Sequence, residues 1–226
     1  MTEKLEIEDL TINLVKKRVR NINLRINQNG EIYVSCPKNT PLNYLLKFLN
    51  EKKDWIKKAL ENSYEKSKYG NKKFLEGEKH YLFGKELTLQ IKEEYNKTKI
   101  QIENDTNLIM TVKPQATFKT KEKHLQNFYK KNLEIESIQY FEKWEEILNV
   151  NKMELKIKKM KAKWGYCDFR KKIICLNIEL AKRKREFVEY VILHELCHLI
   201  VPNHGNEFKK LLNLHMPDWK IISKNE

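Results

Sequence analysis

Residues 186–204 read EFVEYVILHELCHLIVPNH, and neither glycine nor proline interrupts them before Pro202. Apolar residues recur in this stretch at the spacing of one helix face: Val188, Val191, Ile192, Leu196 and Leu199. That periodicity predicts a helix over residues 186–201, which Pro202 then ends.

The helix carries the motif His194-Glu195-Leu-Cys-His198. Residues four apart share a helix face, so both imidazoles can reach one tetrahedral metal ion while Glu195 projects beside it. A zinc ion at such a site lowers the pKa of a water ligand to about 7, and a neighbouring carboxylate can take its proton as the water attacks. The motif therefore predicts a zinc hydrolase in which Glu195 is the general base and not a ligand.

An open catalytic zinc site needs a third protein ligand besides the water. His204 follows the motif after five residues, and a turn after the helix can bring its ring back. Glu207 and His215 lie further along the chain and are chemically suitable alternatives. The short reach favours His204, so we expect zinc to be held by His194, His198 and His204.

Other interpretations of the motif fit less well. The five-residue gap matches the metzincin pattern, but Val201 stands where that pattern needs a glycine. Two histidines on an apolar helix could be hydrogen-bonded core residues, yet three with an adjacent glutamate disfavour this. Cys197 projects about 100° away from His198 around the helix, so we expect a small buried side chain and not a fourth ligand.

The composition predicts a globular protein of one large or two small domains, with 226 residues of which 40% are hydrophobic. No apolar run approaches the ~20 residues that span a bilayer, and the N-terminal MTEKLEIE lacks the apolar core of a signal peptide. We therefore expect a cytoplasmic protein with no membrane partner. The four cysteines are expected to be reduced, with Cys167 and Cys175 as the one pair that a hairpin could bring face to face.

The net charge is +14, from 45 Lys and Arg against 31 Asp and Glu. Such a surplus can mark a polyanionic partner, but nucleic-acid footprints usually cluster on one face, whereas these lysines are scattered. A solvated lysine-rich surface is the favoured interpretation. The densest basic runs, residues 156–163 and 181–186, lie close in sequence to the predicted site, so an anionic substrate stays open.

The first half of the chain is rich in predicted strands. Alternating residues at 22–26 and 32–36 flank a hairpin turn, and a helix is expected over residues 42–60. Further short strands are predicted at residues 81–82, 87–91, 98–102 and 108–112. This half is taken as residues 1–113, a β-rich region with one amphipathic helix.

From residue 114 the pattern turns helical, and strands are then predicted at 153–160 and 172–178, with a turn at 163–167 between them. Helix, hairpin and metal-binding helix in this order are zincin-like. We therefore expect an α+β fold whose region 114–226 is the catalytic part. No internal repeat is evident.

Several stretches together resemble the YgjP-like metallopeptidase family, relatives of the SprT-like zincins, along nearly the full chain. Residues 162–167 (AKWGYC) are similar to its S-R-W-G-S-C turn and residues 173–177 (IICLN) to its I-x-L-N strand. Residues 190–198 (YVILHELCH) are similar to its Y-V-x-x-H-E-L-x-H helix. The pattern continues in order with residues 203–208 (NHGNEF) and 217–218 (PD).

The resemblance implies zinc bound by the three histidines, with Glu195 catalytic. Lys163 stands where the family usually has arginine and Tyr166 where it has serine, which leaves the roles of both positions open. Tyr166 could stabilise an oxyanion or simply pack in a turn. Asn177 could cap the end of a strand or support a ligand histidine.

The family's members are named peptidases, and a nucleoside triphosphate pyrophosphatase activity is also attributed to it. A peptide could pair with the strand predicted over residues 173–178, while lysines would offset the charge of a nucleotide. We expect a zinc metallopeptidase. A metal-dependent nucleotide pyrophosphatase is the alternative, and a non-catalytic nucleic-acid-binding module is a further one.

Overall fold

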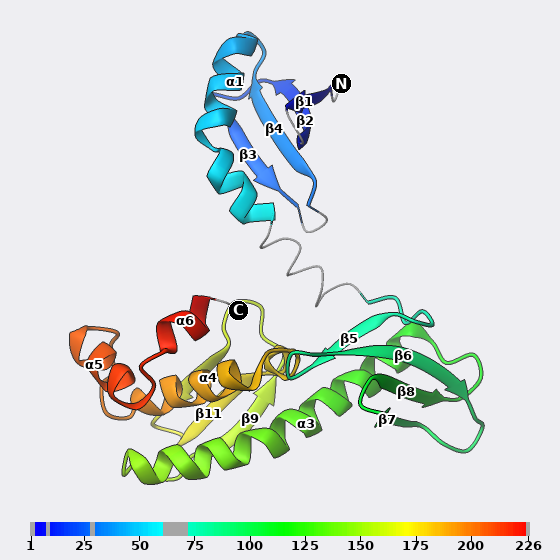
Figure 1. Cartoon of the computed structure of the whole chain (residues 1–226), viewed down its shortest axis with the longest axis vertical. Coiled ribbons are helices and arrows are strands. Elements are labelled where there is room, and N and C mark those ends of the chain that lie inside the picture. Colours follow the sequence, from blue (N-terminus) through cyan, green and yellow to red (C-terminus); the bar gives the residue numbers. More distant parts are fainter. Residues whose placement is uncertain (1–2, 8–9, 28–29, 61–71, 225–226) are drawn as a thin grey trace. The chain divides into compact units, whose positions relative to one another are not determined.

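Alternating apolar residues near the N-terminus bury one face of a four-stranded sheet. The computed structural model describes residues 3–7, 10–27, 30–60 and 72–224, and gives this sheet the order β1-β2-β4-β3 (Figure 1). Its strands are β1 (Glu3–Ile7), β2 (Leu10–Lys17), β3 (Asn23–Ile26) and β4 (Ile32–Pro37). Strands β2 and β4 run parallel, and both outer pairs run antiparallel.

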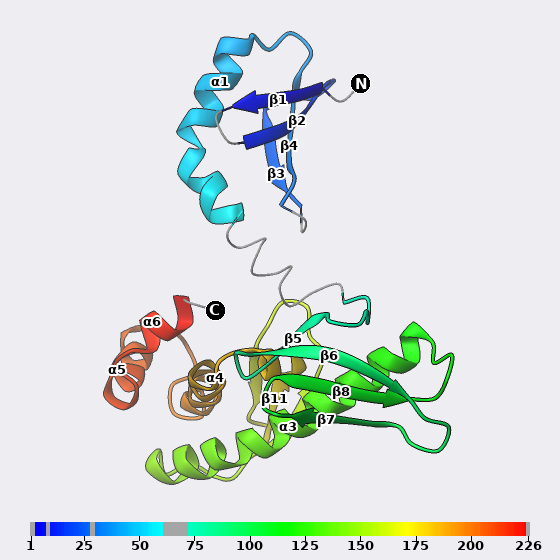
Figure 2. The ribbon, with the colours of Figure 1, turned by 45° about the vertical axis from the view of Figure 1, so that its right-hand side comes forward.

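Helix α1 (Leu42–Glu51) and a helical run at residues 53–60 lie along this sheet (Figure 2). The single helix expected over residues 42–60 is therefore interrupted, by a turn at Lys52. Helix and sheet share one apolar core, made by Ile12, Leu14, Ile32, Val34, Cys36, Leu45, Leu49 and Ile56.

A second sheet repeats the first. Strands β5 (Lys79–Leu82), β6 (Lys85–Glu93), β7 (Lys99–Glu103) and β8 (Asn107–Val112) have the order β5-β6-β8-β7. The central pair is again parallel, the outer pairs are antiparallel, and a helix follows in sequence. No internal repeat was expected from the sequence, yet the topology of the first sheet is repeated in the second. Two sheets can share a topology without similar sequences, because a strand needs only alternating apolar residues on its buried face.

The chain divides into two units, Met1–Lys72 and Lys73–Glu226. This differs from the boundary expected at residues 113–114, which followed the change from strand to helix patterns. The reason lies in the packing: Leu89 and Met110 of the second sheet share one core with Leu125 and Leu133 of α3 (Phe118–Ile147). The second sheet thus belongs to the unit that contains the metal-binding motif.

The same unit holds a three-stranded sheet of order β10-β11-β9, formed by β9 (Glu154–Lys158), β10 (Gly165–Asp168) and β11 (Ile173–Asn177). β10 runs antiparallel to β11, whereas β9 runs parallel to it. The turn expected at residues 163–167 is thus partly an edge strand. Its neighbour β11, expected in a hairpin, is the central strand.

The remaining elements are the 3₁₀ helix η1 (Ile178–Lys182) and the helices α4 (Arg185–Cys197), α5 (Asn206–His215) and α6 (Trp219–Lys224). Helix α4 packs against α3, α5, α6 and β10 (Figure 1). The α+β class is confirmed. Among the described residues, no helix combines the length and apolarity that crossing a bilayer requires.

Candidate metal centre

Helix α4 places the motif at its C-terminal end. His194 and Glu195 lie in the last turn and His198 is the C-cap, so the helix ends earlier than the predicted residue 201. The Val201 N–H still donates to the Cys197 carbonyl at 2.9 Å, after which the chain turns toward α5. His204 lies in this connection.

The three histidines converge. The Nε2 atoms of His194 and His204 are 3.0 Å apart, and one ring nitrogen from each of the three residues lies within 4.8 Å of the others. Zn–N bonds of about 2.0–2.1 Å in a tetrahedral site place ligand nitrogens roughly 3.4 Å apart. The spacing of the rings and their chemistry therefore fit a single metal ion.

Neither rival third ligand joins this group. His215 packs edge-on against Trp144, with ring centroids 5.8 Å apart. Glu207 is exposed in the first turn of α5. Within the described part of the chain, the three histidines are the one group of three or more candidate ligands that lie close enough to share an ion.

Two of the rings are oriented by hydrogen bonds at Nδ1. His198 Nδ1 is 3.3 Å from the Val201 carbonyl, which can only accept, so this nitrogen carries the proton and Nε2 keeps its lone pair. His194 Nδ1 lies 3.4 Å from the hydroxyl of Tyr190. Metal-binding histidines commonly show this arrangement. Tyr190 could have been suspected from its four-residue spacing to His194.

The surroundings of His194 and His198 favour the neutral form of both rings. Burial, followed by the neighbouring His198 and His204, lowers the pKa of His194 to about 4. Burial also lowers the pKa of His198. Phe208 packs against all three rings, with centroid distances of 4.7–4.9 Å. Because a histidine must be deprotonated to bind metal, this environment favours metal binding near neutral pH.

Glu195 is buried, with 7% of its surface exposed. Burial raises the pKa of its carboxyl to about 7, against the lowering effects of the Lys163 charge and of a hydrogen bond from the Cys167 backbone N–H. A carboxylate with a pKa near the working pH is well matched to accept and return a proton. The geometry thus sets this group apart from an ordinary surface glutamate.

The loop before β10 forms one wall of the site and is fastened by Asn177. The Asn177 side chain accepts from the N–H groups of Met160 and Glu179, both at 3.2 Å, and donates to the carbonyls of Met160 at 3.0 Å and Lys163 at 2.8 Å. Asn177 therefore fixes the loop and caps η1 at the end of strand β11, which was one of the two roles expected for it. The four hydrogen bonds go to the loop and to η1, and none of them goes to a histidine of the cluster. Trp164 packs edge-on against Phe187 in the same wall.

Tyr166 lies on the face of β10 that points away from Glu195. Its cross-strand partner is Cys175, and hydrogen bonding to Cys175 raises its pKa. Its neighbours Gly165 and Cys167 both adjoin Glu195, and side chains alternate along a strand. Tyr166 therefore points away from Glu195, which favours a packing role for this tyrosine over that of an oxyanion donor. Cys167 lies opposite Ile174 and not opposite Cys175, so the hairpin does not bring these two cysteines face to face. All four cysteines are free.

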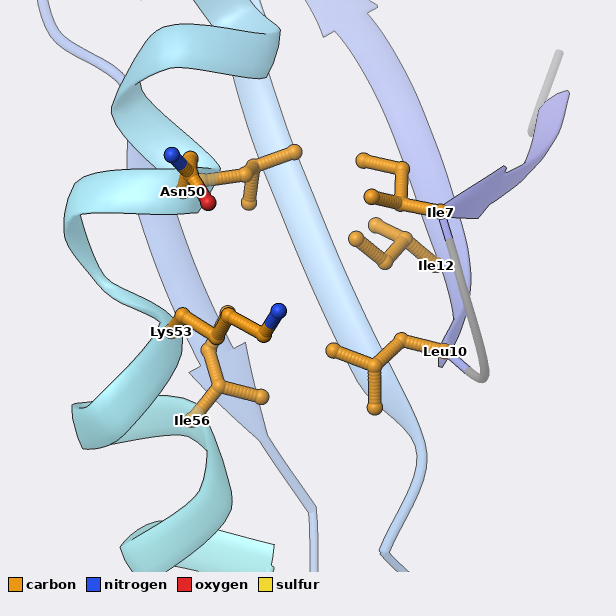
Figure 3. A pocket seen from close by; sticks show the side chains of 7 residues that line it. Ile7, Leu10, Ile12, Asn50, Lys53 and Ile56 are labelled. Atoms are coloured by element: carbon orange, nitrogen blue, oxygen red, sulfur yellow. The ribbon is translucent and has the colours of Figure 1, made fainter.

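The groove in the N-terminal unit offers no comparable chemistry. It is lined by Ile7, Leu10, Ile12, Leu49, Asn50, Lys53 and Ile56 (Figure 3). Its volume of about 20 Å³ is close to what a single water molecule needs. The histidine cluster is therefore the candidate functional site.

A sequence model described as "YgjP-like, metallopeptidase domain" matches residues 20–225. The chain belongs to the YgjP-like family. The resemblance noted from the motifs is thereby confirmed, and membership supports a metal-dependent peptidase. No curated protein matches the chain.

Two solved structures are similar to part of the chain. The metallopeptidase zymogen jannalysin of Methanocaldococcus jannaschii is 28% identical, with a TM-score of 0.35 over 38% of this chain and 83% of that one. The metallopeptidase zymogen abylysin of Pyrococcus abyssi is 22% identical, with a TM-score of 0.36 over 38% of this chain and 88% of that one.

Proposed function

We propose that this chain is a zinc-dependent peptidase in which His194, His198 and His204 hold the metal and Glu195 is the general base. One observation carries the proposal: three imidazole nitrogens lie within 4.8 Å of one another, and two of these histidines flank Glu195 at the end of α4, where the pKa of its buried carboxyl is about 7. A bound zinc ion supplies Lewis acidity that polarises a carbonyl and acidifies water.

The donor set supports zinc. Three neutral imidazoles without an oxygen donor suit zinc and other borderline transition metals, whereas magnesium and calcium prefer oxygen ligands. Three protein ligands also leave a tetrahedral site open, as in catalytic zinc sites. His204 is exposed, so the histidine cluster borders solvent.

Glu195 acts on protons. Its carboxylate takes a proton from the attacking water and returns it to the leaving amine nitrogen. The Lys163 charge and the Cys167 N–H both favour the ionised form of the carboxyl, since each lowers its pKa against the effect of burial. Gly165 lets strand β10 come directly against it.

The edge of β10 supports a peptide as substrate. Strand β11, which we expected to pair with substrate, already has a strand on each side. Within the described residues β10 pairs with β11 only, and Asn177 N–H donates to the Trp164 carbonyl at 2.8 Å. Antiparallel bonding alternates, so the backbone groups of Gly165 and Cys167 point to the outer edge, beside Glu195. An extended peptide can add there as a strand.

The basic runs give less support to a nucleotide or nucleic-acid partner. Several of their cations face carboxylates: Lys156 lies 3.3 Å from Glu154, and Lys182 lies 2.6 Å from Glu179. Arg185, in the second of these runs, pairs with Glu136 at 2.9 Å. These ion pairs favour the interpretation of a solvated, charged surface.

The test uses the purified full chain. Its zinc content is measured, and hydrolysis of an unfolded protein and of a nucleoside triphosphate is followed before and after chelation. We expect about one zinc per chain and chelator-sensitive peptide cleavage. Chelator-sensitive release of pyrophosphate without peptide cleavage would replace the proposed substrate, and failure to take up added zinc would refute the metal site.

A further inference from the structure

Tyr190 lies one helical turn before His194 and faces the ring nitrogen that points away from the other ligands. The Tyr190 hydroxyl is 3.4 Å from His194 Nδ1, and the two rings meet edge to face at 5.7 Å. The opposite nitrogen, Nε2, points toward His204. Tyr190 therefore contacts His194 on the side away from the metal position.

The contact between the Tyr190 hydroxyl and His194 Nδ1 has one direction when Nε2 binds a metal. A nitrogen that binds a metal carries no proton, so the ring proton of a metal-bound His194 lies on Nδ1. A tyrosine hydroxyl can accept a hydrogen bond as well as donate one. Tyr190 then accepts from the Nδ1–H of His194, across the 3.4 Å that separates the two atoms.

A hydrogen bond in this direction stabilises one tautomer. With the proton on Nδ1, the lone pair of His194 lies on Nε2, the nitrogen that faces the metal position. His198 is set in the same way by the Val201 carbonyl. The difference is that the partner of His198 is backbone, whereas the partner of His194 is a side chain held by another helix.

Helix α6 also fixes the ring of Tyr190. Trp219 stacks on it with centroids 6.2 Å apart and planes within 8° of parallel. The Trp219 indole N–H donates to Asn213 of α5 at 2.6 Å, which ties the stacking residue to the helix that follows His204. The face of the tyrosine ring is thus held by helix α6, which is itself tied to α5.

We propose that Tyr190 is a positioning residue for the metal, and that α6 belongs to the metal site through Trp219. The inference rests on the proposed function, because it assumes that His194 is a ligand. Partners of this kind are worth roughly 10- to 100-fold in metal affinity. The C-terminal helix thereby contributes to zinc binding without supplying a ligand.

The test is the zinc dissociation constant of Tyr190→Phe, measured by competition with a chromophoric chelator. Phenylalanine keeps the stack on Trp219 and removes only the hydroxyl. We expect affinity to fall about 10- to 100-fold, together with a changed absorption spectrum of the cobalt-substituted protein. Trp219→Leu, which removes the stacking ring, should shift both readouts in the same direction by a smaller amount.

Tyr140→Phe is the matched control. Its hydroxyl donates to Glu136 on α3, at 3.0 Å, and not to a histidine. Its zinc affinity and cobalt spectrum should equal those of the wild type.

If the wild type binds zinc and Tyr190→Phe has the same dissociation constant and the same cobalt spectrum, the positioning role of Tyr190 is overturned and the metal site is not. Uptake of zinc without peptide cleavage would contradict the proposed activity and leave the positioning role supported by its own readouts. A wild type that binds no zinc would overturn both.

Discussion

Gly165 lies so close to Glu195 that a methyl group at position 165 would stand 2.9 Å from the carboxylate Oε1 and 3.0 Å from Cγ. A Cβ atom is essentially never found under 3.0 Å from a neighbouring atom, so the carboxylate would have to shift to admit one. The missing side chain of one residue thus makes room for the carboxylate of the other. This contact joins the edge strand β10 to the last turn of α4.

Gly165→Ala should therefore slow turnover. The added methyl group displaces the carboxylate, and a shift of about 1 Å at a catalytic group costs on the order of 100-fold in rate. Unfolding should change little, because the end of a glutamate side chain can move. The measurements are kcat for an extended peptide and the zinc dissociation constant, which should stay near the wild-type value. Unchanged kcat would show that this contact does not position the base.

Glu195→Gln should stabilise the metal-free protein at alkaline pH. The folded carboxyl has a pKa of about 7 against an ordinary 4.5, so the folded state holds its proton more tightly than the unfolded chain does. Stability is then lost as pH rises from about 4.5 through 7, by on the order of 2–3 kcal/mol. Glutamine avoids this loss and can still accept the Cys167 N–H.

The measurement is urea unfolding of both proteins under chelation at pH 5 and pH 8. The variant should be the more stable at pH 8, and the difference should shrink toward pH 5. A difference that is independent of pH would contradict the raised pKa.

Lys163→Gln should move the acid limb of the pH profile of kcat/KM to higher pH. Burial raises the pKa of Glu195, and the positive charge of Lys163 lowers it. Removal of this charge should therefore raise the pKa further, so that Glu195 becomes protonated at a higher pH. Lys161→Gln, two residues away on the same exposed loop, is the control and should keep the wild-type profile. A profile that stays in place or moves to lower pH would contradict this electrostatic role.

Asn177→Ala should lower the free energy of unfolding by about 1–3 kcal/mol, because it removes four part-buried hydrogen bonds at once. Urea denaturation measures this. Asn132→Ala, which removes one bond to the Phe128 carbonyl within α3, should cost far less. Equal losses in the two variants would mean that Asn177 does not fasten the wall of the site.

The parts of the site that were predictable from the sequence are local ones. The spacing of His194, Glu195 and His198 depends only on helical geometry, and the position of His204 followed from a short connection. The helix over most of residues 186–201 was predictable for the same reason, since its apolar positions repeat with the helical period.

The parts that were not predictable depend on contacts between distant segments. Strand β10 has four residues, including a glycine, and is a strand only because β11 pairs with it. Likewise, the stacking of Trp219 on Tyr190 joins two helices that no periodicity relates. The domain boundary was misplaced because strand patterns do not show that β5–β8 share their core with α3.

The most direct test of the central claim is the rate of peptide hydrolysis by Glu195→Gln at matched zinc occupancy, with His198→Ala beside it. We expect Glu195→Gln to hold as much zinc as the wild type, about one ion per chain, and to lose nearly all turnover, whereas His198→Ala should lose both zinc and turnover. Wild-type turnover by zinc-loaded Glu195→Gln would contradict the role of this carboxylate as the base.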